Sequence, residues 1–321
     1  PHHETKVMQA QLIAVVGSTG TGKSELAIRI AEAMQQDGQA AEIVNADAMQ
    51  LYKGMDIGTA KLPIAERRGI EHHLVDVLEV TQESTAAEYQ KIARAKILEI
   101  QSRGAMPILV GGSMLYVAAV LNNFEFPVRD KDLRASLEQE LLELGPNAMH
   151  QKLVELDSSA ASRIDPENGR RIVRALEIVT LTGEPFAAAL PDEIESWQEV
   201  LEIGLRMDRE ILVAKLAERV RGMWSKGMVE ETEALISKGL RESVTAGYAI
   251  GYAQALAQLD GELSQEQAIE STTKLTQKYA RRQMSWFKRD TRINWLDALD
   301  PEVTNLAIAL VRSHGLLASR P

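Results

Sequence analysis

The chain has 321 residues, 45% of them hydrophobic and 26% charged, which is typical of a globular protein, and its lack of cysteine excludes disulfides, thiolate zinc sites and cysteine nucleophiles. The net charge of −10 argues against a nucleic-acid partner unless basic residues are concentrated locally. No apolar run is long enough to cross a membrane and no signal peptide opens the chain, so we expect a cytoplasmic protein with no membrane partner.

The N-terminal part of the chain alternates between expected strands and helices. Short apolar runs predict strands at 12–16, 41–45, 73–77 and 106–110, and helical spacing predicts a helix at 23–36. Thr85 and Glu88 form a capping box that opens a second helix, and Gly104 ends it. The expected apolar face of this helix consists of Tyr89, Ile92, Ala93, Ile97 and Ile100. This alternation predicts an α/β fold with a parallel sheet covered by helices on both faces.

After about residue 124 the pattern changes to consecutive helices. Residues 130–182 are expected to form helices interrupted at Gly145-Pro146 and Asp165-Pro166, the segment 200–207 predicts another strand, and the remainder is mainly helical. We therefore expect a core formed by residues 8–124 and 198–316, the latter including C-terminal helices, with a helical insertion domain at 125–197. Nothing in the sequence indicates an obligate dimer, and we expect a monomer.

Residues 17–24 match the phosphate-binding motif G-x4-G-K-[ST] in full, between an expected strand and an expected helix. The glycines allow backbone N–H groups to point at one anion, and the helix N-terminus adds a partial positive charge. Lys23 supplies a full positive charge, and Ser24 a hydroxyl that can reach a phosphate-bound Mg²⁺. The motif predicts a P-loop NTPase-like core that binds a phosphorylated ligand through Gly17, Thr19, Gly20, Thr21, Gly22, Lys23 and Ser24.

Other features expected of a nucleotide hydrolase are missing. The strand expected at 106–110 is followed by Gly111-Gly112-Ser113 rather than by a magnesium-binding acid, and the sequence has no guanine-recognition motif. A GTPase or a motor is therefore disfavoured, whereas a transferase that uses a phosphorylated donor remains open.

Asp47 directly follows the second expected strand. Ligands of α/β sheets bind beyond the C-terminal ends of the strands, so this carboxylate is expected to face the phosphate donor and could accept a proton from a nucleophile. An aspartate at such a place is also a common N-cap or turn residue, and spacing alone does not separate the two roles.

Several segments together resemble the bacterial tRNA dimethylallyltransferase family, also called tRNA isopentenyltransferases. Besides the P-loop, they are Asp47–Tyr52, Gly54–Lys61, Val110–Tyr116, Arg170–Glu177, Gly251-Tyr252 and Arg281–Phe287, in the family's order over almost the whole chain. The resemblance implies transfer of a dimethylallyl group from dimethylallyl diphosphate, with Mg²⁺, to the exocyclic amine of adenosine 37 of tRNA, next to the anticodon.

The resemblance also implies roles for single residues. Asp47 becomes the general base, and Ser113, where many members carry Thr, contacts the reacting groups. Residues implied to contact the anticodon stem-loop of tRNA are Asp47, Ala48, Met49, Gln50, Arg134, Arg170, Arg171, Arg174, Tyr248, Gly251, Tyr252, Arg281, Arg282, Gln283, Trp286 and Lys288.

This chain departs from the family pattern in three ways. Ser18 replaces a frequent Pro, the zinc finger of eukaryotic members is missing, and Tyr248 stands where many members have an Arg that helps to hold the diphosphate.

Two basic segments answer the objection raised by the net charge. In the helix expected near 168–182, Arg170, Arg174 and Glu177 share one face, with Arg171 beside them. A longer helix is expected at 266–289, where cations recur along one stripe: Lys274, Lys278, Arg281, Arg282, Lys288 and Arg289. Either segment could be only a solvated basic face, and we expect the interleaved rings of Tyr279, Trp286 and Phe287 to lie mostly in the core. The six histidines, including His72-His73, are interpreted as structural.

Three other functions remain open from the residues themselves. The P-loop and Asp47 would also suit a kinase that phosphorylates a small metabolite, or prenylation of a free adenine nucleotide. A non-catalytic, nucleotide-dependent RNA-binding switch is a third, although the missing acid after 106–110 argues against it.

Overall fold

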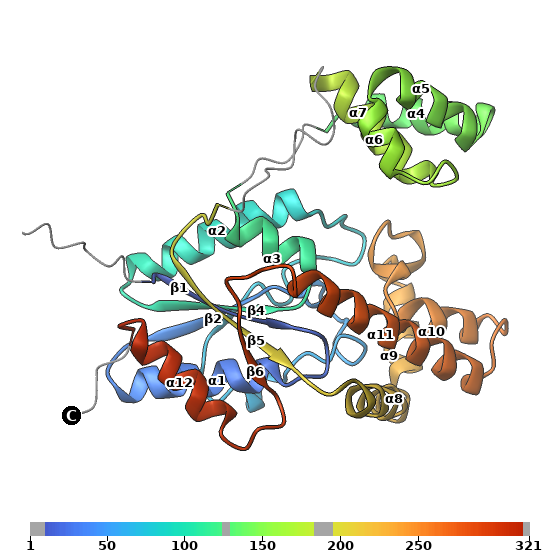
Figure 1. Ribbon diagram of the computed structural model, residues 1–321. Coiled ribbons are helices and arrows are strands. Elements are labelled where there is room, and N and C mark those ends of the chain that lie inside the picture. The colour runs from blue at the N-terminus through green and yellow to red at the C-terminus, as the bar shows by residue number, and fades with distance from the viewer. Residues whose placement is uncertain (1–9, 124–128, 183–194, 317–321) are drawn as a thin grey trace, which may run out of the picture. The chain divides into compact units, whose positions relative to one another are not determined.

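The computed structural model describes residues 10–123, 129–182 and 195–316 (Figure 1). They form two compact units: the first combines the chain up to Leu121 with the chain from Ser196 onwards, and the second spans Asn122–Glu195. The sequence analysis expected the helical insertion at 125–197. Within the described ranges, no helix is both long and apolar enough to span a membrane.

The first unit contains a six-stranded sheet in the order β3-β2-β4-β1-β5-β6, and every neighbouring pair is parallel. This confirms the predicted α/β class with a parallel sheet. The C-terminal ends of β1, β2 and β4 therefore meet at one edge, which carries the P-loop and Asp47. The strands are β1 (Leu12–Gly17), β2 (Ala41–Asn45), β3 (His72–His73), β4 (Met106–Gly111), β5 (Val200–Arg206) and β6 (Asn294–Asp297).

Two strands differ from the sequence expectation. The strand expected at 73–77 is limited to β3, because Leu74 and Asp76 adopt positive φ angles of 61° and 59° that turn the backbone away from the sheet. The strand β6 was not predicted: its short sequence has no clear alternation of apolar residues, and it pairs only with β5 at the edge.

Helices cover both faces of the sheet (Figure 1). On one face, Ile13 and Val15 of β1 pack in a cluster with α1 and α12; on the other, Ala14 and Val16 pack in a cluster with α2 and α3. Thr85 caps α2 as predicted by accepting from Glu88 N at 3.2 Å, but Ile92 is 41% exposed and lies outside the buried face. These helices are α1 (Lys23–Gln36), α2 (Ala86–Ser102), α3 (Met114–Leu121) and α12 (Val303–Ser313).

The rest of the first unit is a helical group with its own apolar cluster. Tyr52 and Met55, from the segment after β2, are fully buried in this cluster together with Tyr252. The group therefore packs against the segment that follows Asp47. Its helices are α8 (Arg209–Ser225), α9 (Met228–Ile236), α10 (Tyr252–Leu259) and α11 (Gln265–Phe287), with 3-10 turns η4 (Leu240–Glu242) and η5 (Ala246–Tyr248); η1 (Ala48–Leu51) and η2 (Ile64–Glu66) lie in the segment after β2.

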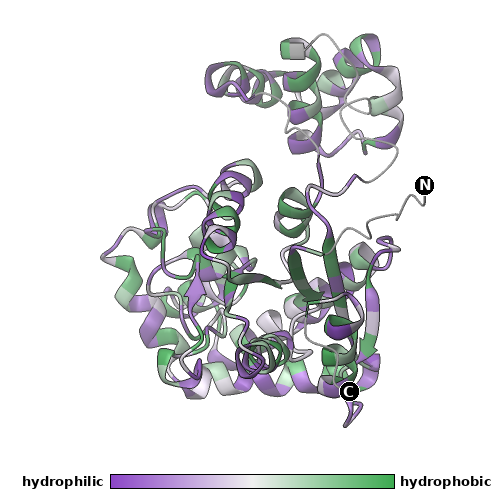
Figure 2. Cartoon of the chain, turned by 90° about the vertical axis from the view of Figure 1, so that its left-hand side faces the viewer, coloured by the Kyte–Doolittle hydropathy of each residue, from purple (hydrophilic) through white to green (hydrophobic). Residues whose placement is uncertain are grey.

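The second unit is built from helices around a separate core that includes Met149, Leu153 and Ile172. Asp130 and Asp157 cap two of the helices with their side chains. The helices are α4 (Lys131–Leu144), α5 (Pro146–Leu156), α6 (Ser158–Arg163) and α7 (Gly169–Thr182). The strands of the sheet are coloured as hydrophobic, whereas the helices of both units carry hydrophobic and hydrophilic bands (Figure 2).

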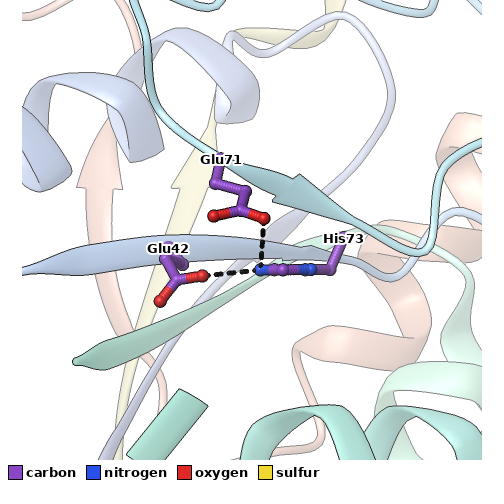
Figure 3. A group of neighbouring side chains, drawn as sticks. All are labelled: Glu42, Glu71 and His73. Carbon is purple, nitrogen blue, oxygen red and sulfur yellow. Dashed lines mark hydrogen bonds and ion pairs between the residues drawn. The ribbon is translucent and has the colours of Figure 1, made fainter. Parts of the chain in front are cut away.

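A cluster of Glu42, Glu71 and His73 lies where β2 meets β3 (Figure 3). Its ligand atoms are close enough to suggest a metal site. However, the Glu42 carboxylate already accepts a hydrogen bond from Arg103 at 2.6 Å and lies 2.7 Å from His73 Nε2. Because these partners satisfy the nearly buried carboxylate, the cluster is better explained as a hydrogen-bonded network at the sheet edge, in line with the structural role expected for His73.

Candidate active site

The P-loop connects β1 to α1 and has the backbone conformation of an anion site. Gly17, Gly20 and Gly22 have φ angles of 138°, 83° and 91°, which favour glycine. Gly22 is the N-cap of α1 and provides no side-chain cap, so the N–H groups of the first helical turn remain available to an anion. The motif read from the sequence thus has the local geometry that phosphate binding requires.

Lys23 folds back over this loop, where its Nζ donates to the Ser18 carbonyl at 2.8 Å. Burial lowers the pKa of Lys23 to about 8, opposed by the Asp47 carboxylate and aided by the Arg219 guanidinium. The amine therefore lies next to both groups and is held by a single neutral carbonyl, a bond that a diphosphate can replace with a stronger charge-assisted one.

Asp47 takes the capping role that the sequence left open, and the general-base role stays a prediction. Its Oδ1 accepts from Met49 N at 3.0 Å and from Gln50 N at 3.4 Å, so it is the N-cap of η1. Burial raises its pKa above the ordinary value of 3.8, although the Met49 hydrogen bond and the Lys23 charge act in the opposite direction. Both cap bonds end on Oδ1, and a carboxylate has a second oxygen that can take a proton.

Two neighbouring side chains fix the backbone around Asp47. Asn45 is 5% exposed; its Oδ1 accepts from Asp47 N at 2.9 Å and its Nδ2 donates to Asp47 O at 3.0 Å. Ser113 Oγ, at the end of β4, accepts from Ala48 N at 2.8 Å. Ser113 therefore holds the loop that carries the acid, whereas the role of Asn45 was not predicted.

Arg219 on α8 is a second residue that the sequence analysis missed. Its Nη1 donates to Thr19 Oγ1 in the P-loop at 3.2 Å, and burial lowers its pKa while Asp47 raises it. It stands near the buried stripe of α8, one residue before Val220 and three after Leu216. An arginine beside an apolar helix face was the available signal, but only the fold shows which ligand site it reaches.

We expect Arg219→Gln to weaken use of a diphosphate substrate. A charge-assisted hydrogen bond contributes about 1.5–3 kcal/mol, so kcat/KM should fall by about tenfold or more. Steady-state kinetics with varied diphosphate would measure the change. Arg221→Gln, an exposed position on the same helix, should leave kcat/KM close to that of the wild type; equal losses in both variants would contradict a specific role for Arg219.

The buried and exposed residues of helix α11 differ in part from those expected for an RNA-binding helix. Gln283 is 2% exposed and its amide bonds Thr19 N and the Gly112 carbonyl, so in this conformation it supports the P-loop and does not face RNA. Trp286 is 39% exposed, which corrects the expectation of a mostly buried ring, whereas Phe287 is buried as expected. The cations Lys274, Lys278, Arg281 and Arg282 are exposed on the helix, and Lys288 and Arg289 are exposed just after its end at Phe287.

The segment around Tyr248 also divides into exposed and buried residues. Tyr248 is 78% exposed on η5, whereas Tyr252 is fully buried and its hydroxyl donates to Glu231 at 2.7 Å. Gly251 is also buried. Direct RNA contact by Tyr252 is therefore not supported, because its ring and hydroxyl are occupied inside the protein. Ala48, Met49 and Gln50 are partly exposed beside Asp47.

In the second unit, two of the predicted arginines lie beside a buried acid. Arg170 and Arg171 are exposed at the start of α7. Arg174 forms an ion pair with Glu177, whose side chain is fully buried, and Arg134 Nε lies 3.7 Å from the same carboxylate. Glu177 thus belongs to the interior, which corrects its placement on the exposed basic face.

Comparisons with known proteins identify the family of this chain. The IPP transferase family model matches residues 50–290. A tRNA dimethylallyltransferase of Clavibacter sepedonicus is 53% identical, covering 97% of this chain and 99% of the relative, and one of Thermobifida fusca is 51% identical over 96% and 97%.

Solved structures give the same result. The tRNA isopentenylpyrophosphate transferase of Bacillus halodurans is 34% identical, with a TM-score of 0.68 and coverage of 96% of this chain and 98% of the other. A eukaryotic dimethylallyltransferase acting on tRNA is 27% identical, with a TM-score of 0.80 and coverage of 97% and 80%. The resemblance seen in the sequence is confirmed: this chain belongs to the IPP transferase family, together with the tRNA dimethylallyltransferases.

Proposed function

We propose that this protein transfers a dimethylallyl group from dimethylallyl diphosphate to the exocyclic amine of adenosine 37 of tRNA, giving isopentenyladenosine. The observation that carries the proposal is the position of the Asp47 carboxylate beside Lys23 and the P-loop, at the edge of the sheet where ligands of α/β folds bind. The names of the relatives, which are tRNA dimethylallyltransferases, support the same activity.

The geometry supports separate roles for the P-loop side of the site and for Asp47 in the reaction. The diphosphate lies on the P-loop, where Lys23, Arg219 and the first-turn N–H groups of α1 stabilise the charge that grows on the leaving oxygen. The bond from that oxygen to the allylic carbon breaks with its electron pair on oxygen, and the adenine nitrogen forms the new bond to carbon. Asp47 accepts the proton that the amine loses.

The acceptor base is stacked inside an anticodon loop and has to swing out to reach Asp47. Exposed cations on α11 and exposed arginines at the start of α7 provide charge for the RNA backbone, which answers the objection posed by the net charge. We also propose that the protein acts as a cytoplasmic monomer, since one chain contributes Lys23, Asp47, Ser113 and Arg219.

Magnesium fits the donor side of this site. Ser24 follows Lys23 on the exposed first turn of α1, and its hydroxyl together with diphosphate oxygens forms the hard oxygen ligand set that Mg²⁺ prefers. We propose that Ser24 and the diphosphate hold this ion, which supplies additional positive charge to the leaving group when it is bound.

The direct test is to incubate tRNA with the protein, Mg²⁺ and dimethylallyl diphosphate, and to analyse the nucleosides by mass spectrometry. Isopentenyladenosine should form only when both substrates are present. Omission of either substrate is the control, and ATP in place of the prenyl donor should give no modified nucleoside. Phosphate transfer from ATP without prenylation would instead support the kinase alternative and overturn the proposal.

A further inference from the structure

The side chain of Gln283 connects α11 to two loops of the active site. Its Oε1 accepts from Thr19 N at 2.9 Å, across 264 residues of sequence, and its Nε2 donates to the Gly112 carbonyl at 2.9 Å, across 171 residues. The residue is 2% exposed. A buried amide that loses its partners is costly, so both bonds hold α11 and the P-loop in one arrangement.

The turn after β4 is shaped to receive this amide. A Cβ atom at Gly112 would lie 2.5 Å from Gln283 Nε2 and 2.6 Å from the Gly17 carbonyl, so a larger residue there would displace one of them. Thr19 is also held from the other side, because Arg219 donates to its hydroxyl at 3.2 Å. Helices α8 and α11 therefore both hold the same residue of the P-loop.

The same face of α11 also reaches the acid. Burial and the Asp47 carboxylate raise the pKa of Tyr279, one turn before Gln283, whereas the Ser113 and Gln283 side chains lower it, so the Tyr279 hydroxyl lies near these groups. Ser113 accepts from Ala48 N, next to Asp47. The helix thus bonds the phosphate loop through Gln283 and brings Tyr279 near the loop that carries Asp47.

Exposed cations surround the buried face of this part of α11. Lys278, Arg281 and Arg282 are exposed on the helix, Lys288 is its exposed C-cap, and the Arg282 guanidinium lies 5.6 Å from the centre of the Tyr279 ring, next to the buried face. An RNA backbone that binds these cations contacts the helix whose buried face holds Thr19. One helix therefore carries both a basic surface and a residue that holds the P-loop.

We propose that Gln283 is a positioning residue that couples RNA binding on the exposed face of α11 to diphosphate binding in the P-loop. The inference rests on the proposed function. RNA that fixes α11 favours the loop arrangement in which Thr19 N is held by Gln283, and this is the arrangement that binds the diphosphate. Because such coupling is reciprocal, the diphosphate must tighten RNA binding by the same factor.

Calorimetric titration with inorganic pyrophosphate and Mg²⁺, with and without a saturating anticodon stem-loop RNA, tests the coupling, since no transfer can occur. In the wild type, RNA should tighten pyrophosphate binding by about fivefold or more. The ratio of the pyrophosphate affinities with and without RNA should fall to about 1 in Gln283→Met. The affinity of this variant for RNA alone should stay within about twofold of that of the wild type. Gln277→Met is the matched control: Gln277 is also on α11, but its Nε2 donates to Val213 O of α8 at 3.0 Å rather than to the P-loop, and the ratio should be unchanged.

The outcomes separate three explanations. The proposal is overturned if RNA tightens pyrophosphate binding by the same factor in Gln283→Met as in the wild type. It is also overturned if this factor is about 1 in a wild-type protein that produces isopentenyladenosine. A purely structural role would lower the melting temperature and both single-ligand affinities together while leaving the ratio intact, which also overturns it. If the wild type makes no isopentenyladenosine, the proposed function fails first. Should Gln283→Met not fold, Gln283→Leu, which also removes both hydrogen bonds, takes its place, and an unreduced ratio in that variant overturns the coupling.

Discussion

Replacing Asp47 by Asn is expected to lower kcat by about 100- to 10,000-fold, the usual contribution of a general base, while dimethylallyl diphosphate binds at least as tightly as before. The amide cannot accept the proton of the adenine amine, and its neutrality removes a negative charge near the diphosphate site. Asn is also a good N-cap, so η1 should remain folded. Single-turnover kinetics on tRNA and a binding assay with pyrophosphate would measure the two effects separately.

The pH dependence gives an independent check of the same residue. Burial raises the pKa of Asp47, and only the ionised carboxylate can act as a base, so wild-type kcat should fall as the pH is lowered through that raised pKa. The acidic limb should be missing in Asp47→Asn. Asp37→Asn, an exposed position after α1, serves as the control, and Asp47→Ala shows how much of any loss comes from the missing cap, which contributes about 1 kcal/mol of stability. Wild-type turnover by Asp47→Asn would refute the assignment.

The second large effect is expected for Lys23→Met. This change removes the full positive charge from the P-loop but keeps a side chain of similar length, so kcat/KM for dimethylallyl diphosphate should fall by about 100- to 1,000-fold. Lys96→Met provides a control, because Lys96 pairs with Glu99 on α2 and lies outside the site. A drop confined to RNA affinity would show that Lys23 does not hold the donor.

Lys23 also predicts how donor binding depends on pH. Because burial lowers its pKa to about 8, the free protein loses this charge as the pH rises through 8. The affinity for pyrophosphate should therefore weaken above about pH 8 in the wild type, in addition to any change from the ligand's own ionisation. In Lys23→Met only the ligand's contribution should remain, and identical pH profiles for the two proteins would contradict the assignment.

The site contains residues of two kinds: some belong to local sequence motifs, and others reach the site from distant parts of the chain. The P-loop and Asp47 are local features: a strand, a glycine-bearing turn and a helix start within a few residues, so spacing alone identifies them. Arg219 and Gln283 reach Thr19 from helices 200 and 264 residues away, and no local pattern distinguishes them from other polar residues on amphipathic helices. Their roles follow from how α8 and α11 pack beside the P-loop.

The sequence by itself determined the class of fold, the phosphate loop, the acid after β2 and the length and charge of α11, because turn glycines, apolar periodicity and helix caps act between near neighbours. Only the tertiary structure decided that β3 is short, that β6 completes the sheet, that Glu177 and Tyr252 are buried, and that Gln283 supports the P-loop. The physical reason is that burial and long-range hydrogen bonds depend on which elements pack together, and this is settled by the whole chain rather than by any one segment.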